Sequence, residues 1–176
     1  MKQILATLCC VALCSAPALA AKKPAQHAAM SDQQFVDFAL QTDMVEANLG
    51  QLAQTSASEQ AVKDYAQMLV TDHTADYHQL GNIAHQAGLS VAGSIDEEHN
   101  KGVIGPFQKL KGAAFDHRYI AEVIAGHAKA IEIYKKEAAD AENAALKSYA
   151  AQTLPTLEKH LSGAKDLEKQ KPAAGK

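Results

Sequence analysis

The apolar residues of this chain recur at intervals of three and four, the spacing of helices that each bury one face. Ser31 or Asp32 can cap the first of these stretches, and Gly88, a common helix terminator, follows the second. The pattern predicts an all-α protein. Its long helices are expected at about residues 32–54, 59–87, 113–139 and 143–167.

The breaks between these stretches predict how the helices are connected. Short polar breaks at 55–58 and 140–142 join neighbouring helices into two antiparallel hairpins. Between the hairpins lies a long glycine-containing connection, residues 88–105, followed by a short helical piece expected at 106–111. A connection of this length can cross the bundle and leave the second and third helices parallel. We therefore expect a ferritin-like four-helix bundle with a long crossover between helices two and three.

Ionisable residues interrupt the apolar stripe of every predicted helix. On the second helix, His73 and Asp76 stand where the spacing from Leu69 calls for apolar side chains. Such groups cost free energy in a core unless they are paired, hydrogen-bonded or bound to a metal. One such residue stands on each of the four helices, namely Glu46, His73, His127 and His160. Asp43 lies one turn before Glu46, and Asp76 lies one turn after His73.

The numbering of these residues places them at matching depths. The midpoints of the pairs Glu46–His73 and His127–His160 lie 84 residues apart. The same offset relates two similar segments, 62–66 and 146–150, one in each hairpin. These midpoints do not coincide with the loop centres, near 57 and 141, which leaves paired Cα atoms roughly 7 Å apart in height. The tilt of side chains toward each helix's N-terminus closes part of this gap, so the four side chains are expected to converge.

One carboxylate and three imidazoles on facing helices suit a Zn, Mn, Fe or Cu ion, and Asp76 or Asp43 could add an oxygen ligand. A second interpretation stays open, in which the same groups form a metal-free network of hydrogen bonds and ion pairs that fixes helix register. A di-iron redox enzyme is disfavoured, because its Glu-x-x-His pattern is missing: Val70 precedes His73 by three residues. No catalytic residue is predicted.

Three further side chains are candidates for supporting the ligands through hydrogen bonds: Asp72, Asp116 and Tyr119. Asp72 adjoins His73 and either orients an imidazole or faces water. Asp116 and Tyr119 lie near the start of the third predicted helix, where an acid also interacts favourably with the helix dipole.

The N-terminus predicts export. Residues 1–20 have a lysine, an apolar run and an Ala-Leu-Ala cleavage motif, the features of a secretory signal peptide. All three cysteines lie within it, so the mature chain would have neither disulfides nor thiolate metal sites. We expect disorder in the lead-in, 21–30, and in the tail, 168–176.

Charge and hydropathy narrow the class of partner. Cleavage removes Lys2 and no acid, so the net charge moves from −3 to −4, which argues against a nucleic-acid partner. No later apolar run approaches the roughly 18 residues of a membrane helix, so no transmembrane segment is predicted after signal cleavage. A homodimer stays open.

Residues 31–167 resemble the bacterial family called domain of unknown function 4142 (DUF4142), which is similar to ferritin-like bundles. The residues that carry the resemblance are Glu46, 68–73, 115–119, His127 and 154–160. The resemblance implies a periplasmic protein of uncharacterised activity, often labelled an outer-membrane protein, so outer-membrane association stays open. We predict a role in metal handling or in protection against oxidative or envelope stress. The alternative is a structural or interaction module of the cell envelope.

Overall fold

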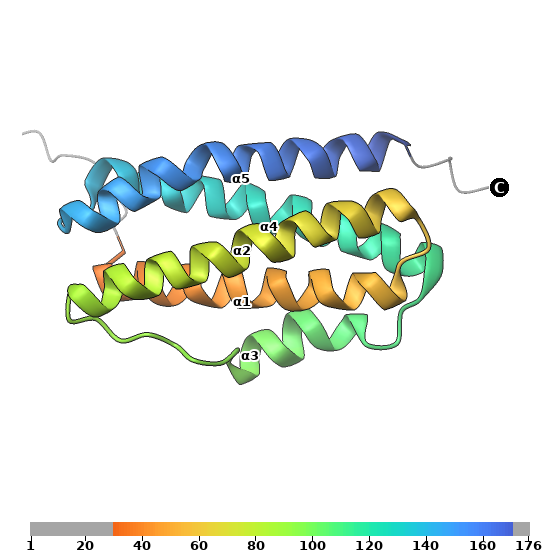
Figure 1. Cartoon of the computed structure of the whole chain (residues 1–176), viewed down its shortest axis with the longest axis horizontal. Coiled ribbons are helices and arrows are strands. Elements are labelled where there is room, and N and C mark those ends of the chain that lie inside the picture. Colours follow the sequence, from red (N-terminus) through yellow and green to blue (C-terminus); the bar gives the residue numbers. More distant parts are fainter. Residues whose placement is uncertain (1–29, 171–176) are drawn as a thin grey trace, which may run out of the picture.

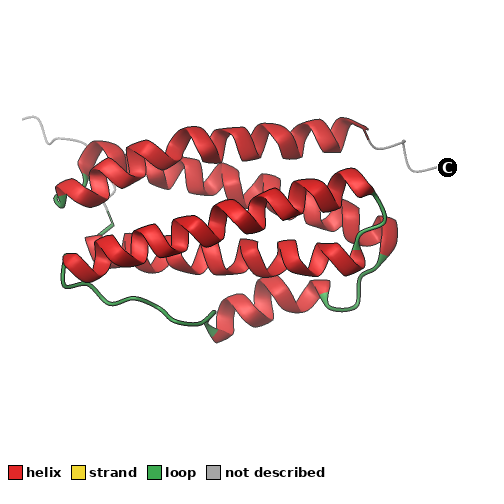
Figure 2. Cartoon of the chain, in the orientation of Figure 1, coloured by secondary structure: helices red, strands yellow, loops and turns green. Residues whose placement is uncertain are grey.

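A computed structural model describes residues 30–170 of the chain. The predicted signal peptide, 1–20, lies outside the described residues, as do nearly all of the lead-in and the last six residues of the tail. Within the described part every regular element is helical (Figure 2). None of the helices within residues 30–170 combines the length and the apolar character that crossing a membrane requires.

Four long helices form the bundle: α1 (Asp32–Ser56), α2 (Gln60–Gln86), α4 (Gly112–Asp140) and α5 (Ala144–Gln170). α1 pairs with α2 and α4 pairs with α5, while α1 also contacts α4 and α2 contacts α5. The crossover returns along the bundle before α4 begins, so that α2 and α4 run in the same direction (Figure 1). This confirms the predicted all-α bundle with its long crossover.

The crossover is more helical than expected, and its helical part starts earlier. It contains α3 (Glu97–His99), a π-helical turn η1 (Asn100–Ile104) and a 3₁₀ turn η2 (Gly105–Phe107). The prediction of a short helix at 106–111 was therefore wrong in position. The side chain of Asp96 accepts a hydrogen bond from the backbone N–H of His99 at 2.8 Å and so starts the helix. Burial of Ile104 and Phe107 then anchors it to the bundle.

The helix ends follow local chemistry. Ser31 and Gln34 form a capping box, with each side chain bonding the other's backbone N–H. Gly88 follows α2 with a φ of 71°, the left-handed conformation that favours glycine. α5 continues to Gln170, so residues 168–170 are helical rather than part of a disordered tail.

The two helices of the first hairpin approach each other closely at Gly50. A Cβ there would lie 2.6 Å from a methyl carbon of Val70 and 2.9 Å from the carbonyl oxygen of Ala66. Only glycine lets α1 come this near to α2. The close contact lies two turns from the centre of α1 and fixes how the polar residues of the two helices meet.

The core consists of two apolar clusters, one toward each end of the bundle. The first includes Leu49, Leu69 and Val123, and the second includes Leu40, Leu80 and Leu157. Along the long helices the two clusters are separated by about one to three turns. Asp43, His73, His127 and His160 lie in that interval, and Glu46 lies at its edge, next to Val45.

Candidate metal centre

A layer of buried ionisable groups separates the two apolar clusters. Its five members are Asp43, Glu46, His73, His127 and His160, each exposing no more than 5% of its surface. Isolated charges at such depth would cost several kcal/mol each, so their hydrogen bonds and protonation states decide whether the layer is stable.

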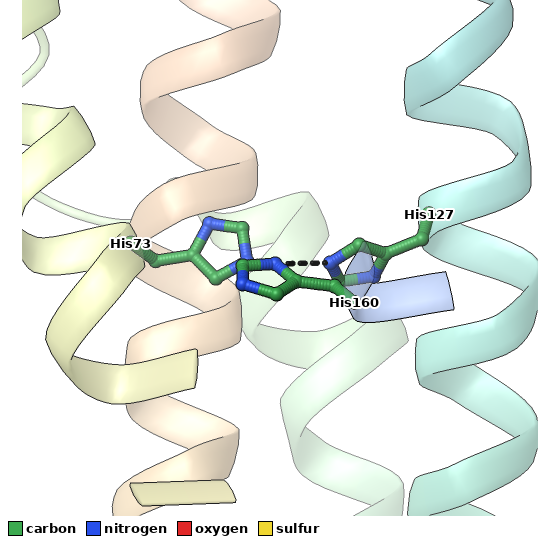
Figure 3. Close-up of side chains that lie close together, drawn as sticks. All are labelled: His73, His127 and His160. Atoms are coloured by element: carbon green, nitrogen blue, oxygen red, sulfur yellow. Dashed lines mark hydrogen bonds between the residues drawn. The ribbon is translucent and has the colours of Figure 1, made fainter. Parts of the chain in front are cut away.

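Three imidazoles meet at the centre of this layer. His73 comes from α2, His127 from α4 and His160 from α5, and Figure 3 shows the rings converging from their helices. Each ring offers a nitrogen within 4.8 Å of those of the other two. The ring centroids form a nearly equilateral triangle with sides of 5.3, 5.4 and 5.4 Å.

Hydrogen bonds outside the triangle occupy one nitrogen of His73 and one of His127. The Nδ1–H of His73 donates to Oδ1 of Asp43 at 2.9 Å. The Nδ1–H of His127 donates to the backbone carbonyl of Val123 at 3.0 Å. Since a neutral imidazole carries one proton, the bond of His127 leaves its Nε2 as the free nitrogen. Nε2 of His73 is buried and has no hydrogen-bond partner.

His160 is oriented the opposite way and reaches the same point. Its Nε2–H donates to Oδ2 of Asp72 at 2.9 Å, which leaves Nδ1 facing the other rings. Nδ1 of His160 lies 3.3 Å from Nε2 of His127 (Figure 3). Two nitrogens bound at 2.0–2.1 Å to one tetrahedral metal ion lie about 3.3 Å apart. The distance therefore fits a shared ion.

Burial keeps the two histidines of the second hairpin neutral. Burial, together with the charge of His73, lowers the pKa of His127 to about 3. Burial also lowers the pKa of His160 to about 4, although the hydrogen bond to Asp72 acts in the other direction. Both rings therefore present an unprotonated nitrogen above about pH 4, as metal binding requires.

His73 differs because it faces a buried acid. Burial alone would lower the pKa of His73, but the hydrogen bond and charge of Asp43 outweigh it and raise the pKa above its usual value. Burial raises the pKa of Asp43 to about 6, despite the opposing effect of His73. The two groups form an ion pair near neutral pH, and a metal at Nε2 would displace one proton from this pair.

Glu46 lies beside the triad rather than at its centre. Its Oε1 is 3.7 Å from Nδ1 of His127, the nitrogen that is turned toward Val123. Its Oε2 is buried without a hydrogen-bond partner. Burial raises the pKa of Glu46, while the charges of His73 and His160 lower it. The sequence placed Glu46 at the level of His73, but the acid that bonds this histidine is Asp43.

The remaining candidate acids occupy three different positions. Asp72 is half-buried and bonds His160, which makes it an orienting group. Asp76 is half-buried, and burial raises its pKa, an effect that the charge of His73 opposes. Asp43 was expected as an additional metal ligand, but its Oδ1 is occupied by His73.

Asp116 and Tyr119 lie near the start of α4, about two to three turns before His127. Asp116 is buried and accepts hydrogen bonds from the backbone N–H groups of Ser58 and Glu59 and from the hydroxyl of Ser58. It thus stabilises the start of α2 rather than supporting the histidines. Tyr119 stacks on Phe115, and its buried hydroxyl has no partner. Burial raises the pKa of Tyr119.

The sequence analysis did not predict one group that orients a histidine, the backbone carbonyl of Val123. It lies one turn before His127 on the same helix, so the bond is local. The available signal was weak, because any helical side chain with a donor can reach the carbonyl four residues earlier.

The family model described as "Domain of unknown function (DUF4142)" matches residues 16–167. No curated protein matches the chain in sequence. A solved structure of CopM in the Cu(II)-bound form is similar, with a TM-score of 0.67, 13% identity, and coverage of 80% of this chain and 97% of CopM. A structure of CopM in the Ag-bound form is also similar, with a TM-score of 0.64 and 12% identity, and the match covers 82% of this chain and 99% of CopM. At this identity the likeness concerns the fold.

Proposed function

The chain belongs to the DUF4142 family, and from that premise we propose that it binds a single transition-metal ion through His73, His127 and His160. Copper is the ion that we favour. One observation carries the proposal: three buried imidazoles each bring one ring nitrogen within 4.8 Å of the other two, while the other nitrogen of each ring is held by a hydrogen bond. Metal-binding histidines have this arrangement, because the outer acceptor fixes the ring's tautomer and orientation.

The donor set narrows the choice among Zn, Mn, Fe and Cu. Imidazole nitrogen suits Zn, Cu and Fe, whereas Mn prefers oxygen ligands. Among divalent ions copper binds most tightly to a given site of this kind. The similarly folded CopM has been crystallised with Cu(II) and with Ag, which supports the same choice.

Glu46 is proposed as the oxygen donor that accompanies the three nitrogens. Its Oε2 is buried without a hydrogen-bond partner and is therefore available. Its carboxylate lies beside His127 and would offset the charge of a buried cation.

We propose metal handling, in the periplasm, as the biological role. The three histidines expose at most 1% of their surface, which suits retention of an ion more than turnover of a substrate. Retention would also protect an envelope from a redox-active metal. The periplasmic location rests on the N-terminal sequence and on the family resemblance.

The test is metal content after loading. Wild type and His73→Ala/His160→Ala are incubated with Cu(II) or Zn(II), desalted, and analysed by plasma mass spectrometry. We expect about one equivalent in the wild type and almost none in the double variant. His85→Ala/His117→Ala, which alters two exposed histidines, is the matched control and should retain the ion.

Equal, near-zero metal in wild type and variant would contradict the proposal and favour a metal-free network. That alternative makes its own prediction, because chelator would then leave the melting temperature of the wild type unchanged. Under metal binding, chelator lowers the melting temperature of the loaded protein, since a ligand that binds only the folded state stabilises it.

A further inference from the structure

A second feature of the bundle bears on how an ion could reach the buried triad. A pocket of about 400 Å³ lies between α1, α2 and the crossover. Asp43 and His73 form its buried end, and both expose no more than 3% of their surface. Met44 and His78 line its outer part, where Met44 is half-buried and His78 is exposed.

The buried end of this pocket contains unsatisfied polar atoms. Oδ2 of Asp43 and Nε2 of His73 are both buried without a hydrogen-bond partner. Leaving such an atom unpaired in a core costs about 1–3 kcal/mol, so these two positions favour an added polar or cationic group. The residues that line the pocket thus run from exposed His78 to two buried residues that each carry an unsatisfied polar atom.

The side chains at the outer part indicate which cation. A methionine thioether is a soft ligand that selects Cu(I) and similar monovalent ions, and imidazole also binds copper. Hard ions such as Mg²⁺ and Ca²⁺ require oxygen ligands, which Met44 and His78 do not offer. Methionine is also flexible, which lets its sulfur follow an ion over a short distance.

The crossover wall of the pocket is held in place. The side-chain amide of Gln41 donates to the carbonyl of Ser94 at 3.1 Å and accepts from the N–H of Asp96 at 3.0 Å. The hydroxyl of Tyr77 donates to the carbonyl of Ala92 at 2.7 Å. Ser94 and Tyr77 both line the pocket, so its shape is fixed by these bonds.

We infer that this pocket is the path by which the ion enters, and that Met44 and His78 form an outer binding site for Cu(I) or Ag(I). The inference rests on the proposed function of the triad. Transfer inward is ligand exchange: the sulfur of Met44 and the nitrogen of His78 are replaced one at a time by imidazole nitrogens, beginning with His73. The ion keeps its single positive charge, so no oxidant or reductant takes part.

The kinetic test compares uptake rates in matched variants. Transfer of Cu(I) from its complex with bicinchoninate is followed by the loss of the complex's colour in a stopped-flow instrument. The double variant Met44→Leu/His78→Gln should take up Cu(I) at least tenfold more slowly than wild type, with an equilibrium affinity within twofold. The control Met68→Leu/His85→Gln changes the same residue types elsewhere on α2 and should match wild type.

A second measurement detects the outer site directly. With ¹³C-methyl methionine, substoichiometric Ag(I) should shift the methyl resonance of Met44 and leave that of Met68 in place. A Met44 resonance that does not move, or a double variant with wild-type uptake rate, would overturn the inference while leaving the triad intact. Failure of wild type to bind either ion would overturn the inference and the proposed function together.

Discussion

The two hairpins of the bundle contribute chemically different halves to one buried layer. The α1–α2 hairpin carries both carboxylates of the layer, Asp43 and Glu46, together with a histidine whose pKa is raised, His73. The α4–α5 hairpin carries two histidines whose pKa values burial lowers to about 3 and 4, His127 and His160. The same residue type is therefore cationic on one side and neutral on the other.

The difference shows that the partner, more than depth, decides the charge of a buried imidazole. His73 and His127 are equally buried, at 1% exposure each. One donates to a carboxylate and the other to a backbone carbonyl. A carboxylate stabilises the protonated ring, whereas a neutral carbonyl cannot offset its desolvation. The second hairpin thus supplies ready nitrogens, and the first supplies the negative charge that a bound cation needs.

We expect the largest effect when a ligand nitrogen is removed from the α4–α5 hairpin, whose histidines are neutral. His127→Phe keeps an aromatic ring in place but deletes a ligand. We expect copper affinity to fall by more than the roughly 10–100-fold that loss of an outer hydrogen-bond partner costs. Competition against a chelator of known affinity measures the change, and His117→Phe on the same helix is the control. Unchanged affinity would show that α4 contributes no ligand.

We expect the next largest effect when a negative charge is removed from the α1–α2 hairpin, which carries both buried carboxylates of the layer. Asp43→Asn keeps the side chain's shape but takes away the carboxylate that holds His73. We expect copper affinity to fall by about 10–100-fold. Asp72→Asn, at the half-exposed acid that bonds His160, should cost less than about tenfold because solvent screens it. The same competition assay would contradict the comparison if Asp72→Asn had the larger effect.

Without metal, the two neutral histidines of the α4–α5 hairpin should lower the stability of the protein in acid. The folded pKa values of His127 and His160 lie below 6.5, so their contribution is complete above pH 6.5 and is lost as pH falls toward 4. The folded pKa of Asp43 is raised to about 6, so its contribution changes in the opposite sense and is lost as pH rises from 3.8 through 6.

The raised pKa values of four acids, Asp43, Glu46, Asp76 and Glu137, act in the opposite sense, so the histidine contribution is predicted as a difference between two proteins. From pH 6.5 to pH 4.5 we expect wild type to lose about 1 kcal/mol or more of unfolding free energy relative to His127→Phe, because the variant lacks the buried neutral ring. Urea unfolding of both proteins with chelator present measures the difference. An equal slope in wild type and variant would contradict the assignment of His127 as a buried neutral ring.

The smallest expected effect is on stability, and it concerns Glu137, a buried acid of α4 that lies away from the histidines. Burial, together with the charge of Asp32, raises the pKa of Glu137 to about 7. The folded pKa exceeds the unfolded one, so stability is lost as pH rises from 4.5 through 7. Glu137→Gln should be about 1 kcal/mol more stable than wild type at pH 8 and similar to it at pH 5. Thermal unfolding at both pH values measures this, and an equal difference at the two would contradict it.

Much of the fold could be predicted from the apolar spacing. The stripes gave the four long helices, and the lengths of the breaks gave two hairpins and a crossover. The helical part of the crossover was misplaced because its position depends on a cap at Asp96 and on burial of Phe107. The second of these is a tertiary contact that local sequence does not report.

The site could be predicted only in part. The three histidines were found because each replaces an apolar residue on a buried stripe, and the structure brings their rings together. The partner of His73 was not found. Numbering placed Glu46 at its level, but the packing of α1 on α2 brings Asp43 there instead, a shift of about one turn. Helical spacing gives the buried face, whereas the relative height of two helices depends on how they pack.

The most direct measurement of the central claim is anomalous scattering from a crystal of the copper-loaded protein, recorded on both sides of the copper absorption edge. We predict one strong peak inside the bundle, about 2.0–2.2 Å from Nε2 of His73, Nε2 of His127 and Nδ1 of His160. A strong peak elsewhere, with the interior of the triad free of copper, would contradict it.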